Sequence, residues 1–163
     1  MNRRILFVCS GNTCRSPLAE AFARSEAARR GASHTLASSA GTFALPGQPA
    51  TGGAVKAASA HGLDLTAHRS RPLTAELVAS ADLVVGMTVD HLAAVRRLSE
   101  SVPAVLATEY LPADHPHSRA GVPDPFGGND QVYGETARLL AACVKGLFDR
   151  LAGPSREGPA HGR

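Results

Sequence analysis

The chain alternates between short apolar runs and stretches in which apolar residues recur every three or four positions. Residues 3–8, "RRILFV", end in the first apolar run, which is typical of a strand buried on both faces. Ser16 and Pro17 then predict the N-cap and the first position of a helix. Apolar residues follow at helical spacing: Leu18, Ala19, Phe22 and Ala23. This segment is therefore predicted to be a strand, a tight loop and a helix.

The same alternation continues along the chain. Further strands are predicted at residues 34–41, 81–87 and 102–108, and further helices at residues 54–61, 74–80, 90–99 and 131–151. We therefore predict an α/β fold of the Rossmann-like or flavodoxin-like class, a single three-layer domain with a central four-stranded parallel sheet and helices on both faces. The domain is expected to span residues 1–152, and residues 153–163, which lack apolar periodicity, are expected to form a disordered tail.

Composition narrows the class of protein. The 163 residues suffice to bury one core without disulfides or metals. The formal net charge is only +3 and the basic residues are scattered, which argues against nucleic-acid binding. Neither a secretion signal nor an apolar run long enough to span a membrane is recognisable. We therefore expect a cytoplasmic protein, with no membrane association, whose three cysteines are reduced.

The loop "CSGNTCR", residues 9–15, is the first candidate site. In an open parallel sheet, ligands bind beyond the carboxyl ends of the strands, where a loop that enters a helix presents free backbone N–H groups. Gly11 and Asn12 tolerate left-handed backbone conformations, and Arg15 adds a planar, two-pronged donor. Together these residues predict a cradle for a tetrahedral oxyanion.

Cys9 opens this cradle, beside the helix N-terminus and the guanidinium group, and both of them favour a thiolate. A thiolate beneath a bound phosphate is a nucleophile aimed at phosphorus, and Ser16 could donate a further hydrogen bond to the sulfur. The alternative is that Cys9 is a small buried apolar residue. Zinc binding is disfavoured, because Cys9 and Cys14 lack two further ligands and Arg15 would repel the metal.

The long loop at residues 109–130 supplies candidates for the proton donor that a departing group needs. Asp114, Asp124 and Asp130 all lie in it, and Asp124 is preferred because prolines on both sides restrict its backbone. Plain turn formation is the alternative for Asp124. His115 and His117 in the same loop are interpreted as solvated, so neither a metal nor a cofactor is expected.

With both motifs placed, the sequence resembles the low-molecular-weight protein-tyrosine-phosphatase family. The family pattern V-C-x-G-N-x-C-R-S-P is met by residues 8–17, and the resemblance extends to about residue 151. The other matching segments are "SSAGT" at 38–42, "TAHRSRPL" at 66–73, "ADLVVGM" at 81–87 and "DPFGG" at 124–128. The resemblance implies a phosphatase that acts on phosphorylated proteins through a thiophosphate intermediate. We expect the protein to be a monomer and to need no cofactor.

The resemblance also implies residue roles. Cys9 would form the intermediate, Arg15 would hold the phosphoryl oxygens, and Asp124 would protonate the leaving group and then activate water. The phosphate-binding loop would comprise Ser10, Gly11, Asn12, Thr13, Cys14 and Ser16. Family practice further ties the loop asparagine to a serine and a histidine behind it, here Asn12, Ser39 and His68, although His68 could instead be a surface residue.

Two positions concern the substrate. Tyrosine-directed members usually carry an aliphatic residue where this chain has Thr13, and two aromatic residues where it has Phe126 and Gly127. The protein-arginine phosphatases of the same family carry Thr and D-P-F-G-G at these positions, so phosphoarginine is the predicted substrate and phosphotyrosine the alternative. The Thr13 hydroxyl could meet a guanidinium edge, and Asp124 could accept a hydrogen bond from it. The alternative is that Thr13 is a tolerated wall residue with no role in selection.

The other cysteines separate the remaining alternatives. Cys14 could trap an oxidised Cys9 as a disulfide, a redox hypothesis that intact-mass analysis after mild peroxide would test, or it could simply pack in the core. Thioredoxin-coupled arsenate reductases share the loop but need two further cysteines, whereas only Cys143 remains here, within a helical apolar pattern. A non-catalytic phosphoprotein-binding module would be expected to lack the nucleophile, the arginine or the acid, and all three are present.

Overall fold

The computed structural model describes residues 2–153 and is built around a four-stranded parallel sheet in the order β2-β1-β3-β4. The strands are β1 (Arg3–Cys9), β2 (Thr35–Gly41), β3 (Leu83–Gly86) and β4 (Ala104–Leu106). The chain leaves β1 for β2 on one side and then returns to β3 on the other, so the strand order reverses at β1. In doubly wound folds the ligand crevice lies at this switch point, beyond the carboxyl ends of the strands.

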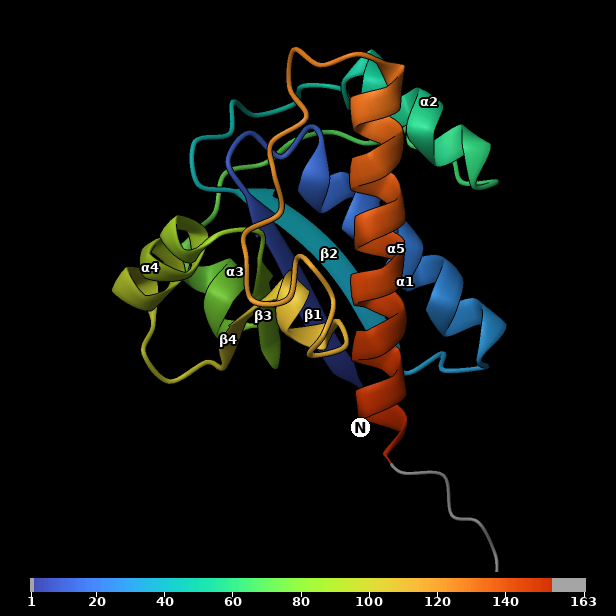
Figure 1. Ribbon diagram of the computed structural model, residues 1–163. Helices are drawn as coiled ribbons and strands as arrows, with labels where there is room; N and C mark the ends of the chain where they lie inside the picture. Colours follow the sequence, from blue (N-terminus) through green and yellow to red (C-terminus); the bar gives the residue numbers. More distant parts are fainter. Residues whose placement is uncertain (1, 154–163) are drawn as a thin grey trace, which may run out of the picture.

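Helices cover both faces of the sheet, as the alternating pattern predicted. They are α1 (Arg15–Arg29), α2 (Gly52–Ala60), α3 (Ala75–Ala79), α4 (Val89–Leu98) and α5 (Asp130–Ala152), with a 3-10 turn, η1, at Ala107–Tyr110. Figure 1 shows α1, α2 and α5 on one side of the sheet and α3 and α4 on the other, which confirms the predicted three-layer domain. No helix within residues 2–153 is both long and apolar enough to cross a membrane.

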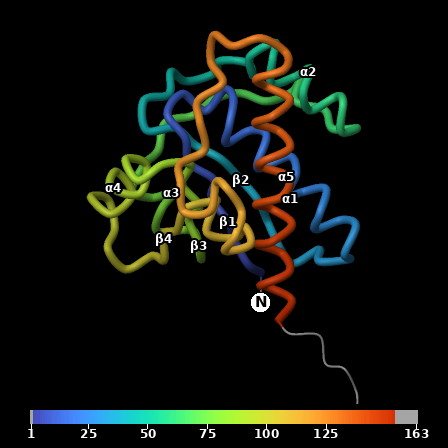
Figure 2. Tube along the Cα trace, viewed as in Figure 1, coloured from blue at the N-terminus to red at the C-terminus, as the bar shows by residue number. Residues whose placement is uncertain are grey.

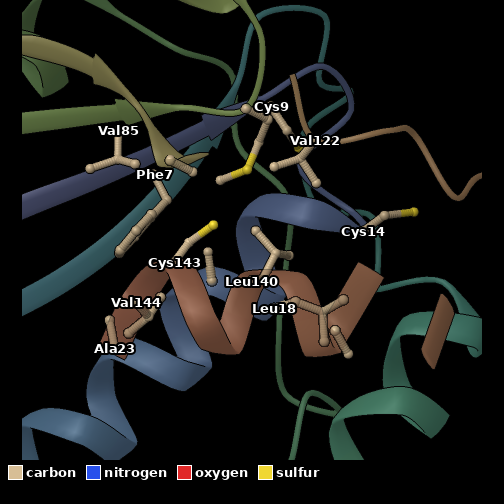
Figure 3. Close-up of a cluster of buried hydrophobic side chains, with 14 of the residues drawn as sticks. Phe7, Cys9, Cys14, Leu18, Ala23, Val85, Val122, Leu140, Cys143 and Val144 are labelled. Atoms are coloured by element: carbon tan, nitrogen blue, oxygen red, sulfur yellow. The ribbon is translucent and has the colours of Figure 1, made fainter. Parts of the chain in front are cut away.

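Strand β1 divides the core into two apolar clusters because successive side chains on a strand point to opposite faces. Ile5 and Phe7 pack on the α1 and α5 side, whereas Leu6 and Val8 pack on the α3 and α4 side. Cys9 continues the row of Ile5 and Phe7, so the fold delivers its side chain to the face that carries α1 (Figure 3). The periodicity of one strand thus decides on which side of the sheet the candidate nucleophile lies.

Three sequence-based boundaries were wrong. Helix α1 begins at Arg15 with Cys14 as its N-cap, so Ser16 does not cap it, and the Cys14 side chain makes no capping hydrogen bond. The predicted strand at 102–108 shortens to Ala104–Leu106, because residues from Ala107 turn into η1 and pack beneath α5. Strand β3 starts only at Leu83; before it, the Asp82 backbone N–H donates to the Arg4 carbonyl and the Asp82 side chain accepts from the Arg4 backbone N–H. The predicted tail lies outside the described residues from residue 154 on.

Candidate active site

The loop between β1 and α1 turns at Asn12, which has a φ angle of 55°. Gly11, which could also tolerate this conformation, lies outside the left-handed region, so Asn12 alone supplies the turn. Asparagine enters this region more readily than other residues with a side chain, especially when local hydrogen bonds hold it there. Figure 2 shows the dark-blue loop after β1 at the carboxyl end of the sheet. The free N–H groups of α1 therefore face the predicted ligand crevice.

Asn12 is fully buried and holds the loop from behind. Its Nδ2 donates to Ser16 Oγ at 2.8 Å and to Ser39 Oγ at 2.9 Å, and its Oδ1 accepts from the Arg71 backbone N–H at 2.9 Å. His68 Nε2 lies 2.7 Å from the Asn12 carbonyl oxygen and, because a carbonyl only accepts, must carry the proton. The structure thus brings Asn12, Ser39 and His68 together, with the side-chain amide of Asn12 fully paired.

Cys9, the candidate nucleophile, lies at the base of the loop with only 2% of its surface exposed. Its Sγ is 3.0 Å from Ser16 Oγ. Because Ser16 Oγ already accepts from Asn12, its own hydroxyl hydrogen is free to donate to the sulfur. The serine that does not cap α1 therefore links the Asn12 anchor to the thiol, where it can stabilise negative charge on sulfur.

Arg15 is 4% exposed and bridges the loop to the segment that carries the candidate acid. Its Nη1 donates to the Val122 carbonyl at 3.0 Å, and its Nη2 lies 3.6 Å from Asp124 Oδ2. Among residues 2–153, Arg15 Nε is the only buried side-chain nitrogen or oxygen without a hydrogen-bond partner. An unpaired buried donor costs ~1–3 kcal/mol, which an oxygen of a bound anion would relieve.

A cavity of about 140 Å³ joins these groups. Its lining residues are Cys9, Gly11, Thr13, Cys14, Arg15, Asp124 and Phe126. Asp124 stands at the mouth with its side chain 54% exposed, and its Oδ1 accepts from the Phe126 backbone N–H at 3.1 Å. The candidate nucleophile and the candidate acid thus occupy the base and the rim of one cavity, the arrangement that an in-line displacement at phosphorus requires.

The structure separates Asp124 from the two other acid candidates. Asp130 is in the first turn of α5 and pairs with Lys56 at 2.6 Å, and neither Asp130 nor Asp114 lines the cavity. Among residues 2–153, no group of three or more histidine, cysteine, aspartate or glutamate side chains is arranged to hold a metal ion. The site is therefore built from a thiol, a guanidinium group, a carboxyl group and backbone N–H groups.

Comparison with known proteins agrees with this geometry. Residues 4–156 match the sequence family described as low molecular weight phosphotyrosine protein phosphatase. The chain belongs to this family. This phosphatase is 40% identical over 151 residues to a protein-arginine-phosphatase of Bacillus subtilis, with 90% of this chain and 95% of that protein covered. It is 34% identical over 155 residues to a low molecular weight protein-tyrosine-phosphatase of Streptomyces coelicolor, with 91% and 93% covered.

Solved structures give the same answer. The YwlE arginine phosphatase, in a mutant with a phosphorylated active-site serine, superimposes with a TM-score of 0.82 at 38% identity, covering 94% of this chain and 98% of its own. A YwlE mutant from Bacillus subtilis gives a TM-score of 0.81, also at 38% identity, covering 93% and 99%. The chain is therefore a protein phosphatase, a hydrolase.

The phosphatase holds Cys14 in a polar cluster that sequence analysis missed. Cys14 Sγ lies 3.3 Å from Thr51 Oγ1 and 3.4 Å from Tyr133 Oη, and those two oxygens are 3.1 Å apart. Burial raises the pKa of Tyr133, and its hydrogen bond with Cys14 raises it further, so the phenol stays protonated. A disulfide between Cys9 and Cys14 stays a prediction, since all three cysteines are free in this structure. Cys143 is buried among Phe7, Leu140 and Val144, which confirms its packing role (Figure 3).

His91, in the first turn of α4, is a second residue that sequence analysis missed. Its Nε2 lies 2.9 Å from Ser10 Oγ, and its Nδ1 accepts from the Thr88 backbone N–H at 3.1 Å. Burial is the larger cause and the positive charge of Arg15 the second, and together they lower the pKa of His91 from 6.5 to about 4 against the opposing effect of Asp90 and Asp124. The ring is therefore neutral near pH 7.

The buried neutral His91 predicts a loss of stability in acid. Between pH 6.5 and about 4 the unfolded chain binds a proton at this position that the folded chain does not, so the free energy of unfolding falls as pH falls through this range. This contribution of His91 to the free energy of unfolding is fully present above pH 6.5 and amounts to at most ~3 kcal/mol. Urea denaturation at a series of pH values should show a shallower pH dependence for His91→Asn than for wild type. Identical slopes would contradict this origin.

Proposed function

We propose that this phosphatase removes phosphate from phosphoarginine in proteins, with Cys9 as nucleophile, Arg15 as phosphate ligand and Asp124 as acid and then base. The observation that carries the arginine preference is Thr13 in the wall of the cavity that Asp124 also lines, with Phe126 as the one aromatic residue among the lining residues. The 40% identity to a relative named as a protein-arginine-phosphatase supports the same substrate.

In the first step, loop N–H groups and Arg15 would hold the phosphoryl oxygens while the Cys9 sulfur attacks phosphorus. A sulfur–phosphorus bond forms as the phosphorus–nitrogen bond of phosphoarginine breaks. The departing guanidine nitrogen takes its proton from Asp124 at the mouth of the cavity. The phosphorylated serine in the active site of the YwlE mutant supports an intermediate carried on the residue at this position.

In the second step, the Asp124 carboxylate would accept a proton from a water molecule as that water attacks phosphorus. The sulfur–phosphorus bond breaks, inorganic phosphate leaves and the cysteine thiolate is regenerated. The Ser16 hydroxyl, 3.0 Å from Cys9 Sγ, would stabilise this thiolate as it departs. The cycle needs no metal or redox partner, but it does need a reduced thiol, which supports action in the cytoplasm.

Thr13 would select the substrate by shape and by hydrogen bonding. Its β-branched side chain narrows the space that a phenyl ring would occupy, and its hydroxyl can pair with an N–H of the substrate guanidinium. A site that pairs a polar substrate edge rejects analogues lacking that edge, because its own buried polar group is then left unpaired.

Replacing Thr13 with isoleucine tests the proposed substrate. Thr13→Ile is expected to lower kcat/KM on phosphoarginine protein by ~10- to 100-fold and to raise it on phosphotyrosine protein. Thr13→Ser, which keeps the hydroxyl group, is the matched control and should retain the arginine preference. Inhibition by inorganic phosphate should stay within a few-fold of wild type, since the loop N–H groups are unchanged.

Phosphotyrosine is the second candidate substrate, and the family description and the Streptomyces coelicolor relative favour it. A wild-type preference for phosphotyrosine that Thr13→Ile leaves unmoved would establish that alternative and make Thr13 a wall residue. Cys9, Arg15 and Asp124 line one cavity, so the proposed site is complete within a single chain, and we propose that it acts as a monomer on phosphorylated proteins. Activity per subunit that is constant across dilution would agree with a monomer.

A further inference from the structure

We propose that His91 is a positioning residue of the phosphatase reaction, because it holds Ser10, the first residue of the phosphate-binding loop, against helix α4. The inference rests on the proposed role of Cys9, which directly precedes Ser10. Ser10 and His91 are 81 positions apart in the sequence, and Ser10 Oγ and His91 Nε2 are 2.9 Å apart. Neither side chain lines the catalytic cavity, so any effect on catalysis must pass through the loop backbone.

The direction of this hydrogen bond follows from the other ring nitrogen. His91 Nδ1 lies 3.1 Å from the backbone nitrogen of Thr88, and a backbone N–H can only donate. Nδ1 therefore has no hydrogen in the neutral ring, so Nε2 carries it and donates to Ser10 Oγ. The same ring thus accepts the N-terminal N–H of α4 and donates to the loop, which fixes its orientation at both ends.

The hydrogen bond closes a gap in the anchoring of the loop. On the β2 side, the Cys9 and Ser10 carbonyl oxygens accept from the backbone N–H groups of Thr42 and Phe43, each at 2.9 Å. Asn12 anchors the middle of the loop from behind, as described above. On the α4 side, His91 supplies the side-chain contact to Ser10. Without it, the backbone just after the nucleophile would be held on one side only.

Helix α4 is a firm support for this contact. Leu92 packs so closely on β3 that a Cβ added to Gly86 would lie 2.8 Å from its Cδ2, and Val95 is fully buried. Since β3 pairs directly with β1, the helix, its strand and the nucleophile strand form one packed unit. A donor on α4 therefore holds Ser10 at a fixed position relative to Cys9.

Three charged groups influence the protonation of the His91 ring. They are Arg15 on α1, Asp124 in the loop at residues 109–130, and Asp90 on the same helix as His91. Arg15 disfavours a proton on the ring, whereas Asp90 and Asp124 favour one. Protonation would turn Nδ1 into a donor facing the Thr88 N–H and so break the contact that orients the ring. The hydrogen bond from His91 to Ser10 is thus expected to hold the loop while the ring is neutral and to be lost at acid pH.

The test compares His91→Asn, Ser10→Ala and the double variant, assayed on p-nitrophenyl phosphate so that protein specificity plays no part. Asparagine places an amide oxygen where Nδ1 accepts from Thr88 and leaves nothing in the place of Nε2. Each single variant is expected to lower kcat/KM by ~10-fold and to weaken inhibition by inorganic phosphate in parallel. The double variant should be no worse than either single one, since both remove the same hydrogen bond.

Val144→Ala, on α5, is the control for lost stability, because it removes buried apolar volume on the side of the sheet opposite to α4. It should lower Tm and leave kcat/KM unchanged, whereas a purely structural His91 would lower Tm without any loss of phosphate affinity. Losses in the two single variants that multiply in the double variant, or single variants as active as wild type, would overturn the proposal. Full activity of Cys9→Ser would instead refute the proposed function, so the two failures are distinguishable.

The affinity for inorganic phosphate, measured as the pH is lowered, provides a second test. If the neutral ring holds Ser10, phosphate affinity of the wild type should decline on acidification toward the titration of His91, and His91→Asn should show the lower affinity at every pH without that decline. A decline of equal size in both proteins would place its cause elsewhere and remove His91 from the mechanism.

Discussion

Replacing Cys9 with serine is expected to lower kcat/KM on phosphorylated proteins by more than ~10⁴-fold while leaving the fold intact. A serine hydroxyl is a far weaker nucleophile than a thiolate, and the site offers Cys9 no neighbouring base that could activate an alcohol: its side-chain contact is Ser16. The smaller hydroxyl fits the 2%-exposed position, and the Asn12 anchor does not depend on sulfur. Inorganic phosphate should therefore still bind.

Steady-state assays on phosphoarginine and phosphotyrosine proteins measure this loss, and Tm shows that the variant is folded. Cys143→Ala is the matched control. Burial raises the pKa of Cys143 to about 12, so this residue stays a thiol and its removal should cost stability but not turnover. A Cys9→Ser variant that retained a tenth of wild-type activity would mean that phosphorus is attacked by another group, and the proposed intermediate would have to be abandoned.

The large effect expected for Cys9→Ser reflects how many features of the site position the Cys9 sulfur. The alternation of side chains along β1 places Cys9 on the face of the sheet that carries α1. The left-handed conformation of Asn12 turns the loop, and the Ser16 hydroxyl contacts the sulfur and does not cap the helix. Each of these features has a cost in isolation, such as the φ of 55° at a residue with a side chain. The buried hydrogen bonds of Asn12 offset that cost, so the loop is preorganised before phosphate arrives.

The parts of this site that could be predicted from sequence are those encoded locally. A strand, a Gly-Asn loop and a Ser-Pro helix start lie within fifteen residues, so spacing alone located Cys9 and Arg15 near one end of a sheet. Asp124 could be predicted for a similar reason, because the prolines on both sides of it are visible in the sequence. Its place beside Arg15, 109 positions away, came from the family resemblance and not from any local pattern.

The parts that sequence reasoning missed depend on contacts between distant elements. Ser10 meets His91 across 81 positions, Cys14 meets Tyr133 across 119, and Glu20 accepts from Ser39 at 2.6 Å. His91 offered one local signal, since it occupies the third helical position after a threonine N-cap, where a polar side chain can reach back to the cap. That signal predicts a capped helix and says nothing of Ser10, because the second ring nitrogen finds its partner only when β1 and α4 pack together.

Replacing Asp124 with asparagine is expected to lower kcat on phosphoarginine protein by ~10²–10⁴-fold with little change in KM. Asparagine can still accept from the Phe126 N–H, so the local turn survives, but it can neither protonate a leaving group nor accept a proton from water. The 3.6 Å contact with Arg15 loses its charge and costs little, because the Asp124 side chain is 54% exposed. Asp130→Asn is the matched control: it breaks the pair with Lys56 outside the cavity and should leave kcat unchanged.

The leaving group distinguishes a catalytic acid from a residue that merely shapes the cavity. p-Nitrophenolate departs without a proton, so Asp124→Asn should form the phosphoenzyme from p-nitrophenyl phosphate at nearly the wild-type rate and then hydrolyse it slowly. A burst of p-nitrophenol equal to the enzyme concentration would reveal that accumulation in a stopped-flow experiment. A variant that is slow in both steps on this substrate would instead indicate that Asp124 acts by holding Arg15. The acid would then have to come from elsewhere in the loop, with Asp114→Asn as the next measurement.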